Sequence, residues 1–286
     1  MNLTLITACY NSAATIRTCI ESVLSQRGAD VEYIVVDGGS SDGTVDIIKE
    51  YASNLAHPAS PTSPTRLTSP TRPAFQWLSE PDRGMYDAIN KGIKMATGDI
   101  VGILNADDVL ASDNQLAHIA ELFSRVERVD CVYADIRFVK EGGSVEALRA
   151  APTVRYCSAK WWKPWMFRFA AMVPHPSFYV RRECFARFGG YSLDYRICAD
   201  FELELRYLYL ARLRAAYLPE CVVVMRMGGA STAGWRSNIE INREDLRALR
   251  ANGVWSCLPL IYLKYIFKIW GFVFGRRLGR ARGAVS

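Results

Sequence analysis

Residues 32–43 read Glu-Tyr-Ile-Val-Val-Asp-Gly-Gly-Ser-Ser-Asp-Gly, and this stretch decides the fold. Its first five residues, 32–36, are rich in β-branched and aromatic side chains and predict a strand. The strand ends at Asp37, and residues 38–43 are turn formers. In an open α/β sheet, ligands bind beyond the carboxyl ends of the strands. A buried strand that stops at a carboxylate and a glycine-rich turn therefore places a candidate site at this end of the sheet.

The segments on either side repeat the alternation of strand and helix. Residues 3–7 predict a short buried strand, and the apolar spacing from Ile16 to Leu24 predicts a helix that Asn11 or Ser12 would cap. Downstream, the patterns predict a helix from 45, a strand at 75–78, a helix to about Ala96 and a strand at 100–104. This order predicts an α/β fold with a mostly parallel central sheet flanked by helices.

The predicted strand ends bring carboxylates together. Thr7, Asp37 and the pair Asp107 and Asp108 all follow or end a strand. Two adjacent carboxylates after an apolar strand are costly unless they face solvent, pair with cations or bind a metal. Oxygen ligands favour Mg²⁺ or Mn²⁺, and Mg²⁺ is typically held by one or two carboxylates together with substrate phosphates. Helix capping by Asp107 and Asp108, and turn formation by Asp37, are alternative explanations at this point.

Composition limits the partners that this chain can have. The chain has 286 residues, enough for two domains or one large α/β unit, and a net charge of +6. Residues 255–286 contain six basic residues and no acidic ones, so the rest of the chain is neutral overall. This distribution argues against nucleic-acid binding and favours contact of the C-terminus with an anionic surface. Eight cysteines without a CxxC pair, three histidines and an N-terminus without a basic signal region predict a cytoplasmic protein without a zinc site.

Several common enzyme classes lack their motifs here. No GxGxxG follows the first strand, no GxxxxGK[ST] is present and no GxSxG elbow occurs, which argues against dehydrogenases, P-loop enzymes and α/β-hydrolases. A set of ordered motifs instead resembles the inverting family 2 glycosyltransferases, of the bacterial polysaccharide-assembly branch and the colanic-acid glycosyltransferase type. The resemblance covers about residues 1–235. Its motifs are residues 7–11, 35–44, 80–92, 96–99 and 104–108.

The resemblance implies a GT-A fold, a nucleoside-diphosphate sugar as donor and a divalent cation, Mn²⁺ or Mg²⁺. It assigns the nucleotide-sugar site to residues of the first half, with Asp107 and Asp108 as metal ligands. Asn105 stands where the family's Asp-x-Asp signature usually begins with an aspartate. The residues assigned to the nucleotide sugar are Thr7, Tyr10, Asn11, Asp37, Arg83 and Asp107.

The same resemblance assigns the catalytic base to the second half of the chain. Asp200 lies in the run Cys-Ala-Asp-Phe-Glu-Leu at 198–203, with Ala199 where the family often has glutamate. An inverting transfer needs one carboxylate to deprotonate the acceptor hydroxyl. Asp194 and Glu202 are the rival candidates, and a helix-capping role is the alternative for Asp200. His175 is interpreted as a structural turn residue.

Composition and the resemblance predict that the chain divides into three segments. Residues 1–110 are the nucleotide-sugar-binding half, 111–235 the acceptor-binding half and 236–286 a helical, basic tail. Within the first half, 53–73 are interpreted as a low-complexity surface insertion because Ser-Pro-Thr recurs three times there. Residues 257–274 are apolar and aromatic apart from Lys264 and Lys268, which would share one helix face, and four arginines follow. We expect this tail, over 256–282, to lie on a membrane surface, with packing on the protein's own core as the alternative.

These observations predict a glycosyltransferase that moves a sugar, with inversion, from a nucleoside-diphosphate sugar to a saccharide acceptor, which we expect to be lipid-linked. The expected setting is cell-surface polysaccharide biosynthesis on the inner face of the membrane. The alternative is a non-catalytic sugar-nucleotide-binding or assembly module, which Asn105 and Ala199 would favour.

Overall fold

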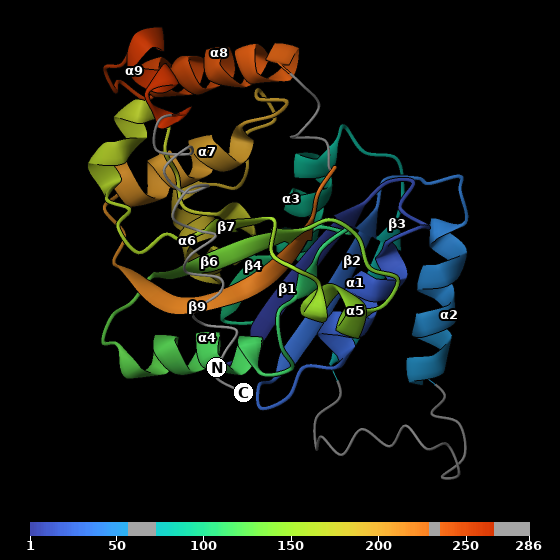
Figure 1. The fold of residues 1–286 in the computed structure, drawn as a ribbon. Helices are drawn as coiled ribbons and strands as arrows, with labels where there is room; N and C mark the ends of the chain where they lie inside the picture. Colours follow the sequence, from blue (N-terminus) through green and yellow to red (C-terminus); the bar gives the residue numbers. More distant parts are fainter. Residues whose placement is uncertain (57–72, 229–234, 266–286) are drawn as a thin grey trace.

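The computed structural model describes residues 1–56, 73–228 and 235–265. One mixed sheet of nine strands runs through the described chain (Figure 1). Its strands are β1 (Leu3–Cys9), β2 (Val31–Asp37), β3 (Ala74–Ser79), β4 (Ile100–Ile103), β5 (Val109–Leu110), β6 (Cys131–Val139), β7 (Arg155–Cys157), β8 (Tyr179–Arg181) and β9 (Ala215–Arg226).

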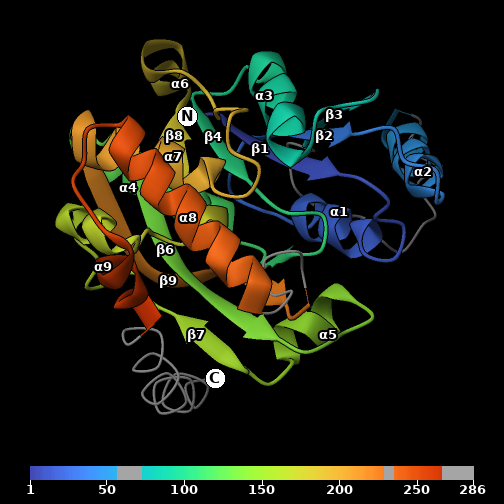
Figure 2. The ribbon, with the colours of Figure 1, turned by 90° about the horizontal axis from the view of Figure 1, so that it is seen from above.

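Helices cover both faces of this sheet (Figures 1 and 2). The α-helices are α1 (Ile16–Leu24), α2 (Thr44–Ala56), α3 (Met85–Met95), α4 (Gln115–Arg125), α5 (Val145–Ala150), α6 (Arg182–Phe188), α7 (Ala199–Glu204), α8 (Trp235–Ala251) and α9 (Leu258–Tyr262). The remaining turns of helix are η1 (Pro164–Phe169), η2 (His175–Ser177) and η3 (Leu205–Leu210), the last of them a π-helix.

The strand order is β3-β2-β1-β4-β8-β6-β9-β5, with β7 paired to β6. The pairs β3–β2, β2–β1 and β1–β4 are parallel, as predicted from the alternation of strands and helices. Beyond β4 only β6–β9 is parallel, and the other four pairs are antiparallel. The prediction of a mostly parallel sheet is therefore wrong for the second half. The regular alternation stops after β4, and antiparallel neighbours do not require the crossover helices that parallel ones do.

The two sides of each central strand bury different helices because successive strand residues point to opposite faces. Leu3 and Leu5 of β1 pack with Ile20 of α1, whereas Ile6 packs with Ile89 of α3. The order reverses at β1, which has β2 on one side and β4 on the other. A topological switch point of this kind opens a crevice at the carboxyl ends of the two strands, where ligands bind in open α/β sheets.

The predicted elements of the first half are confirmed with ends that differ by a few residues. The predicted capping of α1 is wrong: the helix begins at Ile16 after Thr15, not at Asn11 or Ser12. The amides of Asn11 and Ser12 instead donate to Ser40 of the next loop and to Thr44 at the start of α2. Of the predicted insertion, residues 53–56 belong to α2 and 57–72 lie outside the described residues.

The beginning of the C-terminal segment packs on the protein. Ile261 of α9 is fully buried in the same cluster as Leu249 of α8. Lys264 is also buried, and its Nζ lies 2.7 Å from Oδ2 of Asp245. Lys264 therefore faces α8, as the alternative of packing on the protein's own core predicts for this part of the tail, because a buried ammonium needs an acidic partner. Lys268 and the arginines of the tail lie outside the described residues. Within 1–56, 73–228 and 235–265, no helix has the length and hydropathy of a membrane span.

Candidate active site at the carboxyl ends of β1, β2 and β4

The loops that follow β1 and β2 are tied to each other. The side-chain oxygen of Asn11 accepts from the Ser41 amide at 3.0 Å, and the Asn11 amide donates to Ser40 Oγ at 2.8 Å. Asn11 has a left-handed backbone, with φ of 48°, which asparagine tolerates better than most residues. Asp42 also accepts from the Ala13 amide at 2.9 Å. These reciprocal bonds fix the two loops as one wall at the carboxyl ends of β1 and β2.

Asp37 lies beneath this wall with its carboxylate fully buried. Its oxygens accept from the amides of Gly39 and Ser40 at 3.0 Å, from the Ser40 hydroxyl, and from Ser79 Oγ at 2.7 Å. Burial raises the pKa of Asp37, but these hydrogen bonds outweigh it and the net pKa is lowered. Asp37 is therefore an ionised carboxylate that shapes the turn.

Thr7 and Tyr10 occupy opposite situations at the end of β1. Thr7 is fully buried, and its hydroxyl accepts from Tyr33 at 3.1 Å and lies 3.7 Å from Cys19 Sγ. Tyr10 is 64% exposed beyond the end of the strand. An exposed aromatic ring beside these loops offers a stacking surface for a planar ligand. The structure thus places Tyr10 on the surface of the site and Thr7 behind it.

The carboxylates after β4 differ in their surroundings. Asp107 is half-buried, whereas Asp108 is fully buried. Oδ2 of Asp108 accepts from the Asn105 side-chain amide at 2.8 Å, and its Oδ1 has no hydrogen-bond partner. Burial and the nearby charge of Asp107 raise the pKa of Asp108 well above its usual range. The side-chain amide of Asn105 thus donates to Asp108, which explains how an uncharged side chain fits the first position of the Asp-x-Asp signature.

The surroundings of Asp107 and Asp108 fit a divalent cation, because one carboxylate oxygen of Asp108 has no hydrogen-bond partner. An unpartnered buried carboxylate oxygen is costly unless a cation or a donor reaches it, and Asp108 Oδ1 is such an atom. A cation there would also reverse the conditions that raise the pKa of Asp108. Two carboxylates suffice for a metal that takes its other ligands from phosphates and water. Within 1–56, 73–228 and 235–265, no group of three or more acidic, histidine or cysteine side chains forms a complete cage.

Arg226, at the end of β9, is a member of the site that sequence reasoning missed. Its guanidinium donates to the backbone oxygen of Asp107 at 2.5 Å, to Thr18 Oγ1 at 2.8 Å and to the Gly142 oxygen at 3.4 Å. These bonds fix the 105–108 loop against α1. A basic residue at the end of the last strand was the available signal, but only the pairing of β9 with β5 and β6 brings it to Asp107.

Arg83 lies in the loop before α3. Its side chain is exposed and its Nη2 lies 3.6 Å from Oδ1 of Asp87, one turn into the helix. No hydrogen bond or ion pair joins Arg83 to the other predicted site residues among those the structure describes. An exposed pair of this kind contributes little to stability, so the guanidinium is free to reorient toward an anionic ligand.

Asp200 is half-buried in the first turn of α7, and α3 reaches it directly. The Tyr86 hydroxyl is 3.1 Å from Asp200 Oδ1 and donates to the Ile197 oxygen at 2.7 Å. Tyr86 follows Arg83 by three residues within the motif at 80–92. Tyr86 therefore links the motif at 80–92 to Asp200 in the second half of the chain.

A second carboxylate, which sequence reasoning missed, holds the loop that leads to Asp200. Glu244 of α8 accepts from the amides of Ile197 at 3.0 Å, Cys198 at 3.2 Å and Arg196 at 3.3 Å. Three amides converging on one carboxylate form an anion-binding concavity. Glu244 thus fixes the entry to α7 from behind, and its spacing on α8 gave no sign of that role.

The two rivals for the catalytic base are placed less favourably. Glu202 is buried, and its oxygens accept from Arg206 at 2.7 and 2.9 Å, so its charge is already neutralised. Asp194 is exposed on the loop before α7 and contacts Ser192. Among the described residues, Asp200 is the acid that has a hydrogen bond with the Tyr86 hydroxyl.

Behind Asp200 lies a buried polar group centred on His175. The Nδ1 of His175 is 3.7 Å from Glu204 Oε1, and its Nε2 is 3.3 Å from the Tyr191 hydroxyl. Tyr191 stacks on Tyr86, with ring centroids 5.6 Å apart. Burial raises the pKa of the Glu204 carboxyl to about 8, although the contact with His175 lowers it. The expected structural role of His175 agrees with its place in the buried turn η2.

Comparison with solved structures identifies the fold. The mannosyltransferase PcManGT from Pyrobaculum calidifontis, in complex with GDP-Man and Mn²⁺, matches with a TM-score of 0.61 at 21% identity over 99% of this chain and 76% of that chain. S. aureus TarS 1–349 in complex with UDP-GlcNAc matches with a TM-score of 0.59 at 16% identity over 87% of this chain and 66% of that chain. Together they show the GT-A fold.

The sequence comparisons give the family. Residues 4–189 match the model described as glycosyl transferase family 2, and the chain belongs to that family. A PGL/p-HBAD biosynthesis glycosyltransferase of Mycobacterium bovis (strain BCG / Pasteur 1173P2) is 29% identical over 243 residues, which are 84% of this chain and 80% of that protein. The uncharacterized glycosyltransferase YibD of Escherichia coli (strain K12) is 35% identical over 106 residues, 37% of this chain and 26% of that protein.

Proposed function

We propose that the chain transfers a sugar from a nucleoside-diphosphate sugar to a saccharide acceptor with inversion, and that Asp200 is its catalytic base. The Tyr86–Asp200 hydrogen bond carries this proposal, because it fixes one half-buried carboxylate beside the motif that follows β3. The Asp200 carboxylate takes the proton of the acceptor hydroxyl as that oxygen attacks the anomeric carbon. The bond from the anomeric carbon to the diphosphate breaks, and the nucleoside diphosphate leaves with its electron pair.

The donor is proposed to lie at the carboxyl ends of β1, β2 and β4. Tyr10 stacks on the base, Asn11 and Arg83 contact the nucleotide, and Asp107 contacts the ribose and diphosphate. Thr7 and Asp37 support these contacts from beneath, as their burial favours. A Mn²⁺ or Mg²⁺ ion held by Asp107 and Asp108 would supply positive charge for the leaving diphosphate.

The acceptor is proposed to be a lipid-linked saccharide in cell-surface polysaccharide biosynthesis of the colanic-acid type. The acid-free tail favours work at the inner face of the cell membrane, with the protein peripherally associated through 256–282. A relative named for PGL/p-HBAD biosynthesis supports a cell-surface glycan as the product.

One observation favours a second function, that of a non-catalytic sugar-nucleotide-binding or assembly module. Asn105 and Ala199 replace acids that the family often has at these positions, and Asn105 is committed to Asp108. Such a module would bind a nucleotide without releasing product.

Thermal unfolding with UDP, GDP, dTDP and CDP, each with and without Mn²⁺, tests the donor site. A ligand present at 100 times its dissociation constant stabilises the folded state by about 2.7 kcal/mol. We expect one nucleotide to raise the melting temperature only when Mn²⁺ is present. A chain that none of the four stabilises would contradict the proposed donor site.

A further inference from the structure

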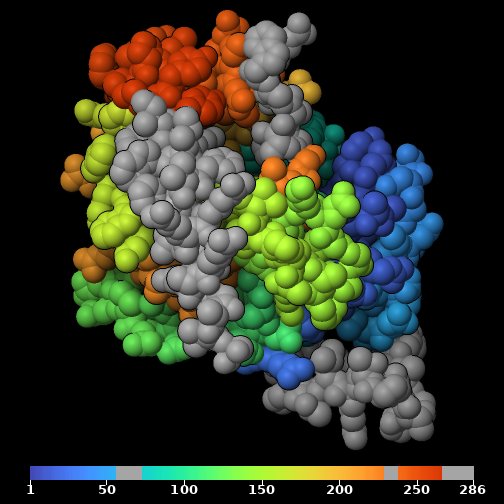
Figure 3. Space-filling view, viewed as in Figure 1, coloured from blue at the N-terminus to red at the C-terminus, as the bar shows by residue number. Residues whose placement is uncertain are grey.

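The described chain holds a second acid-free segment beside the start of the tail. Residues 147–182 contain no aspartate or glutamate and include Lys160, Lys163 and Arg168. The Ser256 hydroxyl donates to the Arg168 backbone oxygen at 2.6 Å, and η1 packs against α9. Figure 3 shows α9 in red with the yellow-green segment of the chain below it at the left edge. Two acid-free stretches far apart in the sequence therefore meet on one surface.

The segments that meet at this junction carry exposed aromatic side chains. Trp161 and Trp165 are 78% and 55% exposed, Trp255 is 69% exposed and Tyr262 is 45% exposed. They include every exposed tryptophan of 1–56, 73–228 and 235–265 whose side chain the structure places. Lys160 lies over the Trp161 ring, 5.0 Å from its centroid. Tryptophan and tyrosine beside lysine are the residues that concentrate at the boundary between lipid and water.

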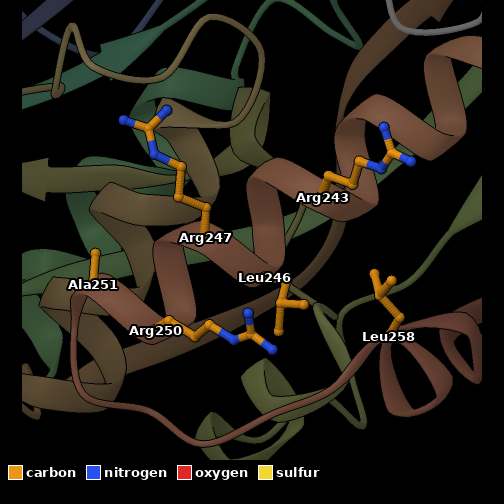
Figure 4. A pocket seen from close by; sticks show the side chains of 6 residues that line it. All are labelled: Arg243, Leu246, Arg247, Arg250, Ala251 and Leu258. Atoms are coloured by element: carbon orange, nitrogen blue, oxygen red, sulfur yellow. The ribbon is translucent and has the colours of Figure 1, made fainter.

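A hollow between α8 and α9 adds basic groups to the same surface. It is lined by apolar Leu246, Ala251 and Leu258 and by exposed arginines of α8 (Figure 4). Arg250 lies alongside Leu246 and faces Leu258, whereas Arg247 turns toward the other side of α8, where it donates to the Asp194 oxygen. Arginine forks match phosphate oxygens, and an apolar floor suits the adjoining glycerol and acyl carbons.

We propose that this surface docks on the headgroup layer of an anionic lipid bilayer. Trp161, Trp165, Trp255 and Tyr262 enter the layer, and Arg243 and Arg250 bind lipid phosphates. The proposal rests on the membrane association proposed above for 256–282 and extends it to η1 and the outer side of α8. The inner side of α8 carries Glu244, so one helix contacts both the docking surface and the loop that leads to Asp200.

Co-sedimentation of the full chain with vesicles tests this surface. The vesicles are either phosphatidylcholine alone or phosphatidylcholine mixed with phosphatidylglycerol, without any saccharide acceptor. Two double variants change the surface: Trp161→Ala with Trp165→Ala, and Arg243→Gln with Arg250→Gln. A third double variant, Arg125→Gln at the end of α4 with Arg128→Gln in the loop that follows, is the control because it removes the same charge elsewhere. Melting temperatures confirm that each variant folds.

We expect the wild type to prefer the anionic vesicles and to release them at high salt. The tryptophan variant loses about tenfold in partitioning because apolar area no longer enters the interface. The arginine variant loses about thirtyfold on anionic vesicles, from about fivefold for each basic residue at the surface. The control partitions like the wild type.

Equal binding by the wild type and the first two variants would overturn this surface while leaving association through the tail intact. A wild type that ignores both vesicles would overturn both membrane proposals. If the control loses as much as the arginine variant, only net charge matters and the surface is rejected. Self-association without vesicles that Trp161→Ala abolishes would make the surface a contact between two copies instead. Nucleotide binding is measured on the same samples, so the transferase proposal stands or falls separately.

Discussion

Replacing Glu244 by alanine should lower turnover far more than nucleotide affinity. Its carboxylate accepts from three consecutive amides, 196–198, at 3.0 to 3.3 Å. A hydrogen bond to a charged group contributes about 1.5–3 kcal/mol, and two of these three bonds are long. Arg196 is exposed and Ile197 is half-buried, so their freed amides regain water, and we expect a loss of only about 2 kcal/mol in the free energy of unfolding.

The effect on catalysis follows from position. Asp200 comes two residues after Cys198, and a displacement of about 1 Å in a reacting group costs about a hundredfold in rate. We therefore expect kcat for nucleoside-diphosphate release to fall about ten- to a hundredfold, measured with the nucleotide sugar that stabilises the wild type best. Binding of the nucleotide should change less than twofold, because its proposed contacts lie at the ends of β1, β2 and β4.

Two variants sharpen this test. Glu244→Gln keeps an acceptor oxygen without the charge, so its loss should fall between those of wild type and Glu244→Ala. Glu240→Ala, at an exposed position one turn earlier on α8, removes the same charge and should leave kcat unchanged. An unchanged kcat in Glu244→Ala, or an equal loss in Glu240→Ala, would refute the reasoning.

Three further outcomes follow from the site. Asp107→Asn should weaken the affinity for the nucleotide in the presence of Mn²⁺ at least tenfold, as measured by calorimetry. If the effect of Mn²⁺ on binding is unchanged, Asp107 is not a metal ligand. Gly38→Ala should lower the melting temperature by several degrees, since its Cβ would overlap the Asp82 carboxylate; a neutral result would mean that this loop relaxes. Glu204 keeps its proton in the folded state up to about pH 8, so the free energy of unfolding should fall as pH rises from about 4.5 to 8, by at most about 1.4 kcal/mol per pH unit. Glu204→Gln should flatten this slope when unfolding is measured as a function of pH. An unchanged slope would contradict the raised pKa of Glu204.

The sequence could predict the first half of the fold because its signals are local. Alternating apolar segments and turn residues located β1, β2, β3 and β4 to within a few residues, and parallel order follows from the helices between them. The second half could not be predicted in this way. Its strands β5, β7 and β8 have only two or three residues each, too short for a periodic pattern.

The candidate site divides along the same line. Asp107, Asp108 and Asp200 were accessible from motifs, because short runs around them keep a recognisable order. Arg226 and Glu244 were not, because each acts on a loop far away in sequence and carries no local signature. Burial was also inaccessible: Thr7 and Asp37 follow the motif pattern, yet only the packed sheet shows that both lie beneath the site.

Asp200→Asn tests the central claim most directly. The change keeps the size of the side chain and an oxygen that can accept from Tyr86, but removes the group that takes a proton. We predict that the variant binds the nucleotide and Mn²⁺ as the wild type does, while kcat for release of the nucleoside diphosphate falls about 10²- to 10⁴-fold, the usual contribution of a general base. Release at the wild-type rate by a folded Asp200→Asn chain would contradict the account.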